Sequence, residues 1–273
     1  MTAQPDLLLV DAHVHFHDCF DAESFFDHSA RNIRRAALTL AAAKTWLGVL
    51  MLSEIQGVDH FARFLDSSYD PPSLARWHLS PTEEPSSLIA RRDTARLLVI
   101  AGRQIATADG LEVLALGTRR RFADGEGFLT TLRAVVESEA LPVVPWGFGK
   151  WWFGRGLLVE RAMDEMGCSA FFLGDSGRRP SIARYPGPLA LARARGMPIL
   201  PGSDPFPLQG HASGCGRYGL VLEGGSEFDV RPAEALKARI RRLRTQPRVF
   251  GGPIGALEFL SDQARLRLRR RRA

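Results

Sequence analysis

Short apolar runs alternate along this chain with longer segments of helical periodicity, and this alternation restricts the fold more than any other sequence feature. The apolar runs predict buried strands at 7–10, 47–52, 96–100, 111–116, 141–144, 169–173, 198–200 and 219–222. Helical patterns occupy 22–44, 58–65, 127–138, 157–166, 188–195, 232–244 and a stretch that begins near 254. Residues 70–87 are rich in Pro and Ser, so we expect a loop there that covers a site.

The alternation continues without a break in composition, which favours one α/β domain with a mainly parallel sheet. The chain has 273 residues, close to the roughly 250 that are typical of a β/α barrel. We therefore predict a single domain over residues 1–260, folded as a distorted TIM-like β/α barrel. A barrel of this kind would have about seven to eight mainly parallel strands.

The positive charge of the chain is concentrated in its last residues. The formal net charge is +6, from 36 Lys and Arg against 30 Asp and Glu. Residues 261–273 contain six Arg and one Asp, a net of +5, so residues 1–260 carry only +1 (6 − 5). The body therefore does not indicate a nucleic-acid-binding groove. We predict a basic, flexible, solvated tail at 261–273, with contact to RNA, an acidic partner or a membrane surface as the alternative.

Cysteine usage and hydropathy indicate the compartment. The three cysteines are an odd number without CxxC spacing, so neither a disulfide framework nor a cysteine-rich zinc site is predicted. The first residues are polar and acidic, and no stretch approaches the roughly 18 uncharged apolar residues of a membrane span. We expect a soluble, cytoplasmic protein with no membrane span, and its oligomeric state stays open.

Polar residues gather where the predicted strands end, which is the side of such sheets that carries active sites. Asp-Ala-His-Val-His at 11–15 directly follows the first strand. Residues two apart on an extended segment project to the same side, so His13 and His15 can bind one cation through neutral imidazoles. A surface or packing role is the alternative. His17 has the same parity but falls in the following loop, so its role stays open.

Carboxylates follow two other predicted strands. Asp204 comes after the strand at 198–200, where it can bind a metal or accept a proton from water. The alternative is that Asp204 only caps the turn before Pro205. Glu54 follows the strand at 47–52 and is a second candidate as ligand or base.

These residues together resemble the polymerase and histidinol phosphatase (PHP) family, a relative of the amidohydrolase superfamily of metal-dependent barrel hydrolases. The resemblance rests on Asp-Ala-His-Val-His at 11–15, Gly-Ser-Asp at 202–204 and the stretches 102–107 and 109–117, in order over residues 7–210. The two middle stretches are similar to the family's Gly-x-Glu-Ile-x-Thr and Gly-x-His-x-Leu-x-Leu-Gly. The resemblance implies a PHP-type barrel and a divalent zinc, manganese or iron ion that activates water.

The sequence departs from the family pattern at several metal ligands. Gln104 stands where the family has a metal-bridging Glu, and Glu112 stands where it has a His. Ser53-Glu54-Ile55 replaces Thr-Asp-His, and Phe206 replaces the last imidazole. The family's three-metal site therefore cannot be assembled. One ion is predicted instead, or a fold that has lost its metal and kept its pocket; the residues left for one ion are His13, His15, Asp204 and Glu54.

A glycine-rich aromatic stretch at 147–156 contains two cations that the resemblance does not explain. The chain has only three Lys, so Lys150 is unusual there. Lys150 and Arg155 suit a phosphate or carboxylate, with Trp151 as a wall of the site. Lys150 could alternatively be a carbamylated metal bridge, as the amidohydrolase resemblance permits. A packing loop with solvated charges is the other alternative.

The segment 174–180 follows another predicted strand and contains Asp175, Arg178 and Arg179. The two arginines can bind an anion, and Asp175 can act as a ligand or hold an arginine in place; a turn with a solvated arginine pair is the alternative. His211 lies beyond Asp204 in the chain and could supply a missing imidazole.

Three functions are consistent with these residues. The first is a metal-dependent hydrolase that acts on a phosphate ester or related anionic small molecule, with Glu54, Asp204 and Lys150 as catalytic candidates. The arginines named above would hold the anionic group. The second is a non-catalytic PHP-like relative that binds an anionic ligand or a protein partner. The third is an amidohydrolase that acts on C–N bonds, which requires Lys150 or Glu54 at the metal.

Overall fold

The computed structural model of the chain describes residues 4–41, 45–66, 74–182 and 185–270. In these residues the strands are β1 (Leu7–Val14), β2 (Trp46–Leu52), β3 (His78–Pro81), β4 (Ser87–Arg92), β5 (Ala95–Ile100), β6 (Gly102–Ala106), β7 (Glu112–Leu116), β8 (Leu141–Pro145), β9 (Phe172–Ser176), β10 (Ile199–Gly202), β11 (Gly219–Glu223) and β12 (Val249–Phe250). The helices are α1 (Ala22–Ala41), α2 (His60–Leu65), α3 (Phe128–Glu137), α4 (Arg155–Met166), α5 (Gly187–Ala194), α6 (Pro232–Arg241) and α7 (Ala256–Arg270), with short 3₁₀ turns at His211–Gly214 and Ser226–Phe228.

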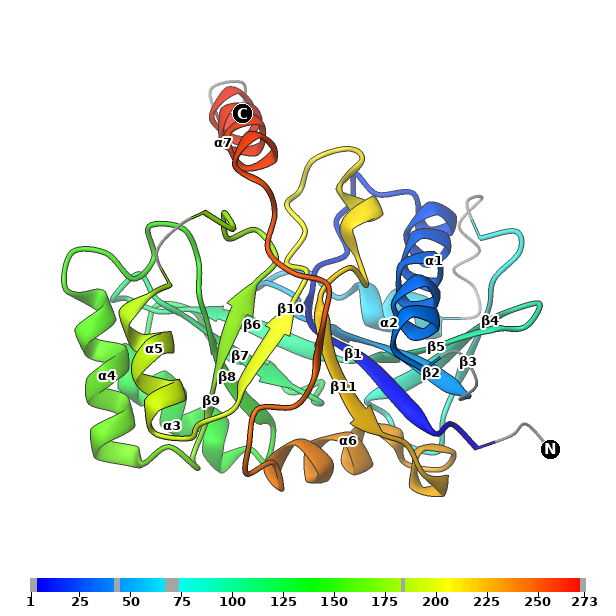
Figure 1. Cartoon of the computed structure of the whole chain (residues 1–273), viewed down its shortest axis with the longest axis horizontal. Coiled ribbons are helices and arrows are strands. Elements are labelled where there is room, and N and C mark those ends of the chain that lie inside the picture. The colour runs from blue at the N-terminus through cyan, green and yellow to red at the C-terminus, as the bar shows by residue number, and fades with distance from the viewer. Residues whose placement is uncertain (1–3, 42–44, 67–73, 183–184, 271–273) are drawn as a thin grey trace.

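The strands form two mixed sheets and not a closed barrel, so the predicted TIM-like barrel is wrong. The first sheet has seven strands in the order β12-β11-β1-β2-β5-β4-β3, and the second has five in the order β10-β9-β8-β7-β6 (Figure 1). Antiparallel pairs join β11 to β1 and β12, β3 to β4, β4 to β5, and β7 to both β6 and β8. Among the strands of the described residues, β1-β2, β2-β5, β8-β9 and β9-β10 pair in parallel, so the sheets are also not mainly parallel.

Short connections explain two of the antiparallel pairs, β4-β5 and β6-β7. Only residues 93 and 94 separate β4 from β5, and only 107–111 separate β6 from β7. A parallel pair needs a crossover of a dozen or more residues, so these strands can only pair as hairpins. The buried runs were assigned correctly as strands, but burial carries no information about strand direction.

The two sheets share one core and are covered by helices on their outer sides. Val10 of β1 and Leu98 of β5 pack in one cluster with Leu114 of β7 and Val143 of β8, and Leu236 of α6 joins them. Helix α1 packs its phenylalanines on the seven-stranded sheet, and α3, α4 and α5 pack on the five-stranded sheet. Figure 1 shows α1 and α2 on one side, α3 to α5 on the other, and α6 below. Most strands of the two sheets are thereby buried on both faces, whereas the edge strand β3 has no buried residue.

The two edge strands of the five-stranded sheet, β10 and β6, contact the inner strands β1 and β2 of the seven-stranded sheet. At β1 and β10 the buried Asp11 carboxylate accepts hydrogen bonds from the Ser203 and Gly216 amides, both at 2.8 Å. At β2 and β6 a single bridge pairs Glu54 with Arg103. These contacts place the ends of β1 and β10 side by side, and with them the histidines and Asp204.

Eight predicted strands correspond to β1, β2, β5 and β7 to β11, whereas β3, β4, β6 and β12 were missed. The predicted loop at 70–87 contains β3 and the first residue of β4, so it is wrong at 78–81 and at 87, and residues 70–73 lie outside the described residues. The predicted helix at 22–44 is α1, and its last three positions also lie outside them.

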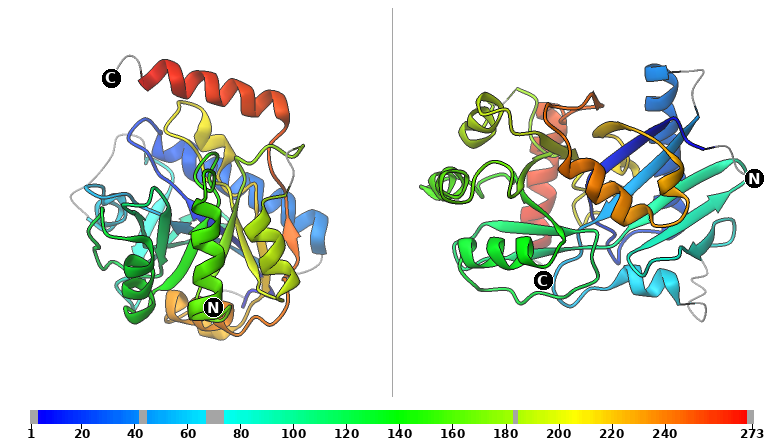
Figure 2. Two further views of the ribbon diagram at one scale, coloured as in Figure 1. Left: turned by 90° about the vertical axis from the view of Figure 1, so that its left-hand side faces the viewer. Right: turned by 90° about the horizontal axis from the view of Figure 1, so that it is seen from below.

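Helix α7 runs through the predicted tail boundary at 261 and continues to Arg270. It lies above the rest of the molecule, at the end opposite α6 (Figures 1 and 2). Residues 271–273 are not described, and the flexibility of the segment in solution stays a prediction. None of the helices in the described residues is long and apolar enough to cross a membrane.

Candidate functional site

Three of the predicted ligands lie together where β1 and β10 end. The Nε2 atoms of His13 and His15 are 3.0 Å apart, and each lies 3.6 Å from Oδ1 of Asp204. All three side chains are largely removed from solvent. The period-two spacing of the histidines and the strand-end position of Asp204 thus produce the cluster that the sequence predicted.

These distances fit a single metal ion. Ligand atoms bound tetrahedrally at about 2.0–2.2 Å from zinc are separated from one another by about 3.4 Å. The three separations here, 3.0, 3.6 and 3.6 Å, bracket that value. Two imidazole nitrogens and one carboxylate oxygen form a donor set that zinc, manganese and iron accept.

Burial keeps the imidazoles in the form that binds metals. Burial lowers the pKa of His13 to about 4, and burial together with the neighbouring His13 lowers the pKa of His15 to about 3. Both rings are therefore neutral at pH 7. Burial also raises the pKa of Asp204, although the nearby His15 and the Ser176 hydroxyl counteract the rise.

The backbone around Asp204 is held in an uncommon conformation. Asp204 has φ of +49°, in the left-handed region that non-glycine residues rarely adopt. Its amide donates to the His13 carbonyl at 2.8 Å, and the Ser176 hydroxyl donates to Oδ2 at 2.7 Å. Oδ1 is thereby turned toward the histidines. A residue that only caps the turn before Pro205 would not need this orientation.

The cluster opens into a cavity of about 520 Å³ that α7 covers. Lys150, Arg178 and Arg269 supply positive charge to its wall, and Trp146 and Phe148 supply apolar surface. Gln263, Leu266 and Arg269 of α7 also line it. With Phe259 and Asp262 they form the inward face of the helix. Their i, i+3, i+4, i+7 spacing is the signal that would have revealed a packed helix in the predicted tail.

A chain of polar contacts links Lys150 to His13. The Lys150 ammonium donates to Oε1 of Glu112 at 2.8 Å, and the Gln104 amide donates to the same oxygen at 3.3 Å. Oε1 of Gln104 lies 3.2 Å from Nε2 of His13. In the sequence, Gln104 and Glu112 stand out as departures from a family pattern and not as members of a contact chain. Their alternation on neighbouring strands β6 and β7 places both at the site.

Arg178 lines the cavity but also anchors α7. Its Nη1 lies 3.1 Å from Asp262 and 3.2 Å from Glu258. Nε2 of His211 donates to Oδ1 of the same Asp262 at 3.0 Å, and burial lowers the pKa of His211. His211 is therefore bound to α7 and lies outside the three-residue cluster. His17 lines the cavity and contacts the Pro205 carbonyl at 2.9 Å.

Three other predicted binding residues serve the packing of the protein. Arg179 forms two hydrogen bonds with Asp175, at 2.8 and 2.9 Å, and the Tyr218 hydroxyl donates to the same carboxylate. Arg155 donates to the Lys150 carbonyl at 2.6 Å and so stabilises the glycine-rich loop. Trp151 is buried in the core beneath the five-stranded sheet. None of these three side chains lines the cavity.

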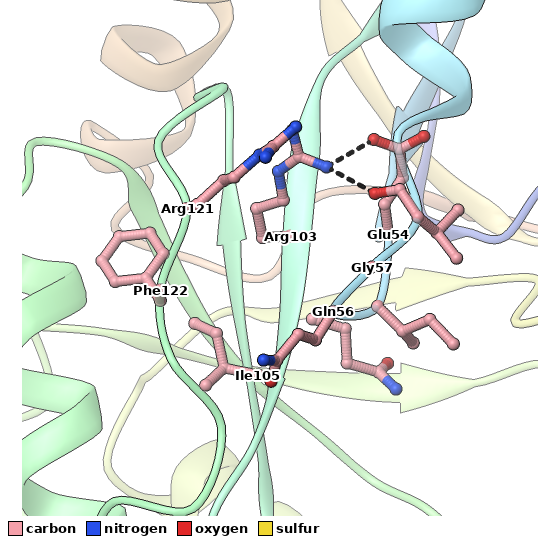
Figure 3. Close-up of a pocket in the computed structure, with 10 residues that line it drawn as sticks. Glu54, Gln56, Gly57, Arg103, Ile105, Arg121 and Phe122 are labelled. Carbon is pink, nitrogen blue, oxygen red and sulfur yellow. Dashed lines mark hydrogen bonds and ion pairs between the residues drawn. The ribbon is translucent and has the colours of Figure 1, made fainter.

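Glu54 lies outside the metal cluster, in a smaller neighbouring cavity of about 340 Å³ (Figure 3). Its Oε2 accepts from Arg103 at 2.9 Å and its Oε1 from the Phe61 amide at 2.9 Å. Arg103 also binds Asp59, which pairs with Arg121. Burial raises the pKa of Glu54 to about 7 in spite of these donors.

Fold and site define a class: a mixed α/β protein of two facing sheets with a candidate three-residue cation site under a covering helix. Neither a scan against protein-family models nor a comparison with curated proteins gives a match. Among solved structures, the chain is similar to PsfC from Pseudomonas syringae PB-5123, with a TM-score of 0.56 and 16% identity. The similarity covers 96% of this chain and 99% of PsfC. At this identity it concerns the fold alone, and membership of the PHP family stays a prediction.

Proposed function

We propose that the protein is a metal-dependent hydrolase that acts on a phosphate ester or related anionic small molecule. The observation that supports the proposal most strongly is the convergence of His13, His15 and Asp204 at the base of a cavity whose wall carries Lys150 and Arg269. A single zinc, manganese or iron ion at this position would supply Lewis acidity and activate a water molecule. Two neutral rings and one carboxylate leave a divalent ion with net positive charge, which suits an anionic substrate.

The cavity cations hold the anionic group of the substrate. Arg178 is neutralised by two carboxylates of α7, and Lys150 is shared with Glu112. Among the described residues, Arg269 makes no ion pair, so its guanidinium is available for a bidentate contact with a phosphate or carboxylate. The segment expected to be a free tail thus contributes a substrate-binding residue.

Glu112 replaces Glu54 as the candidate base. The two Glu54 oxygens are engaged by Arg103 and the Phe61 amide, and Glu54 does not line this cavity. Glu112 does line it, and within the described residues its Oε2 has no hydrogen-bond partner. This oxygen can accept a proton from water, while Lys150 keeps the carboxylate oriented.

Metal analysis combined with a phosphatase assay tests the proposal. The purified protein is loaded in turn with zinc, manganese and iron, and bound metal and p-nitrophenyl phosphate hydrolysis are measured. We expect one ion per chain and turnover that His13→Ala abolishes. The matched control is His78→Ala, because His78 is exposed on β3. Absence of stoichiometric metal, or turnover that survives His13→Ala, contradicts the proposal.

A measurement of phosphate binding added to this experiment tests the non-catalytic alternative. Binding of phosphate without metal or turnover would identify a non-catalytic relative. A C–N hydrolase requires Lys150 or Glu54 at the metal, and neither belongs to the cluster, so it receives no support from the contacts. We expect the protein to work in the cytoplasm, as its cysteine usage indicates.

A further inference from the structure

The outward face of α7 is a stripe of exposed leucines. Leu257, Leu260 and Leu268 are 85%, 61% and 55% exposed, and Ala264 between them is also exposed. At 100° per residue these four positions fall on one side of the helix, opposite the inward Phe259 and the other cavity-facing residues. A helix on the surface of a soluble protein normally carries charged residues on its exposed side. An exposed apolar stripe such as this one indicates a surface that contacts another molecule.

Arginines flank the leucine stripe on both sides. Arg265 and Arg267 are exposed, and neither forms an ion pair with any described residue. The two acidic residues of the helix, Glu258 and Asp262, are engaged by Arg178. The outer side of α7 therefore combines an apolar stripe with uncompensated positive charge.

Exposed aromatic rings adjoin the first turn of α7. Phe148 contacts Phe259 and Trp152 with ring centroids 4.8 Å apart in both cases, and Trp152 contacts Phe153. Phe153 is 91% exposed and has φ of +55°, a conformation that costs free energy for a non-glycine residue. The loop thus holds its most exposed ring in place at the expense of backbone strain.

We propose that α7 docks on an anionic phospholipid surface, with Leu257, Leu260 and Leu268 in the headgroup–acyl boundary and Arg265 and Arg267 on lipid phosphates. Leucines flanked by arginines are the pattern of helices that lie in this interface, and arginines near an anionic leaflet add to the affinity. A second copy of the chain fits less well, because pairing the stripes would bring arginines against arginines. The proposal concerns the face of α7 that the candidate active site does not use, so it stands independently of the hydrolase activity.

Vesicle flotation tests the docking. The full chain is mixed with vesicles of pure phosphatidylcholine, or of phosphatidylcholine with phosphatidylglycerol, and the floated fraction is measured. We expect binding to the anionic vesicles that weakens with added salt. The double variant Arg265→Gln/Arg267→Gln should weaken it about 30-fold, since each arginine near the surface contributes about fivefold. Leu257→Ser/Leu268→Ser should weaken it at least about 10-fold.

The matched control is Arg34→Gln/Leu38→Ser, which removes one exposed arginine and one exposed leucine from α1. It should float like the wild type, and circular dichroism should show the same helix content for all variants. Failure to bind anionic vesicles overturns the proposal, as does equal weakening by the control. Concentration-dependent dimers that Leu257→Ser/Leu268→Ser disperses, without vesicle binding, would overturn it in favour of a second copy.

Discussion

Two carboxylates at strand ends, Asp204 and Glu54, have the same kind of position in the sequence and opposite surroundings in the structure. Asp204 directs one oxygen toward two neutral imidazoles, each 3.6 Å away, and its other oxygen accepts from Ser176. Glu54 has both oxygens occupied, one by the Arg103 guanidinium and one by a backbone amide. A buried carboxylate is thus available to a cation only where its neighbours bring no positive charge of their own.

The difference implies different roles for the two sites. The Glu54 site is already neutralised and bridges β2 to β6, so removing a partner should affect folding. The Asp204 site gathers donor atoms without a compensating cation, so removing one of its residues should affect metal binding. The predictions below separate these roles, from the largest expected effect to the smallest.

Removal of Arg103 should destabilise the fold most. Arg103→Met would leave Glu54 buried without its cation and would deprive Asp59 of one partner. Breaking a buried pair on one side costs about 3–5 kcal/mol, and we expect that loss in the free energy of unfolding in urea. Metal affinity of the folded variant should stay near that of the wild type. A large loss of metal affinity at unchanged stability would place Glu54 and Arg103 in the metal site after all.

Removal of a cluster imidazole should instead weaken metal binding more than it destabilises the fold. His15→Ala should weaken zinc binding by more than about 100-fold, because even residues that only orient a ligand contribute 10–100-fold. Titration calorimetry measures the affinity, and Glu54→Gln serves as the matched control because it changes a strand-end residue outside the cluster. Equal weakening by both variants would contradict the assignment of the metal to His13, His15 and Asp204.

The contrast also shows what the sequence could predict. The convergence of His13, His15 and Asp204 could be predicted because alternation along a strand and the position at a strand end are local properties, whereas metal binding by these residues stays a prediction. The partner of Glu54 could not be found, since Arg103 lies 49 residues away and reaches it only through the packing of two sheets. The barrel was wrong because buried runs do not reveal strand direction. The arginine-rich segment was expected to be a solvated tail, yet its inward spacing, from Phe259 to Leu266, forms the wall of the cavity.

Loss of the Ser176 hydroxyl should have a moderate effect on the cluster. Ser176→Ala removes the donor that turns Asp204 toward the histidines, and we expect zinc affinity to fall roughly 10-fold. The matched control is Thr107→Val, because Thr107 also carries a buried hydroxyl but bonds only to the Leu111 carbonyl. Unchanged affinity in Ser176→Ala would mean that the backbone alone positions Asp204.

The two sites should also differ in how the stability of the folded protein depends on pH, with a small effect for each unit of pH. Burial lowers the folded-state pKa of His15 from 6.5 to about 3, so the unfolded chain binds more protons between these values. The contribution of His15 to stability is therefore lost as the pH falls from 6.5 toward 3. Burial raises the pKa of Glu54 from 4.5 to about 7, so its contribution is complete below pH 4.5 and is lost as the pH rises toward 7.

Urea unfolding of the metal-free protein, with chelator present, measures both dependences. The difference in unfolding free energy between wild type and His15→Gln should increase with pH, and the difference between wild type and Glu54→Gln should decrease. Each slope is limited to about 1.4 kcal/mol per pH unit, because one proton is linked at each site. If both free-energy differences changed with pH in the same direction, the surroundings of His15 and Glu54 would not differ in the way that their contacts indicate. Opposite slopes would establish that one strand end keeps uncharged metal donors while the other holds a carboxyl group that burial favours in its neutral form.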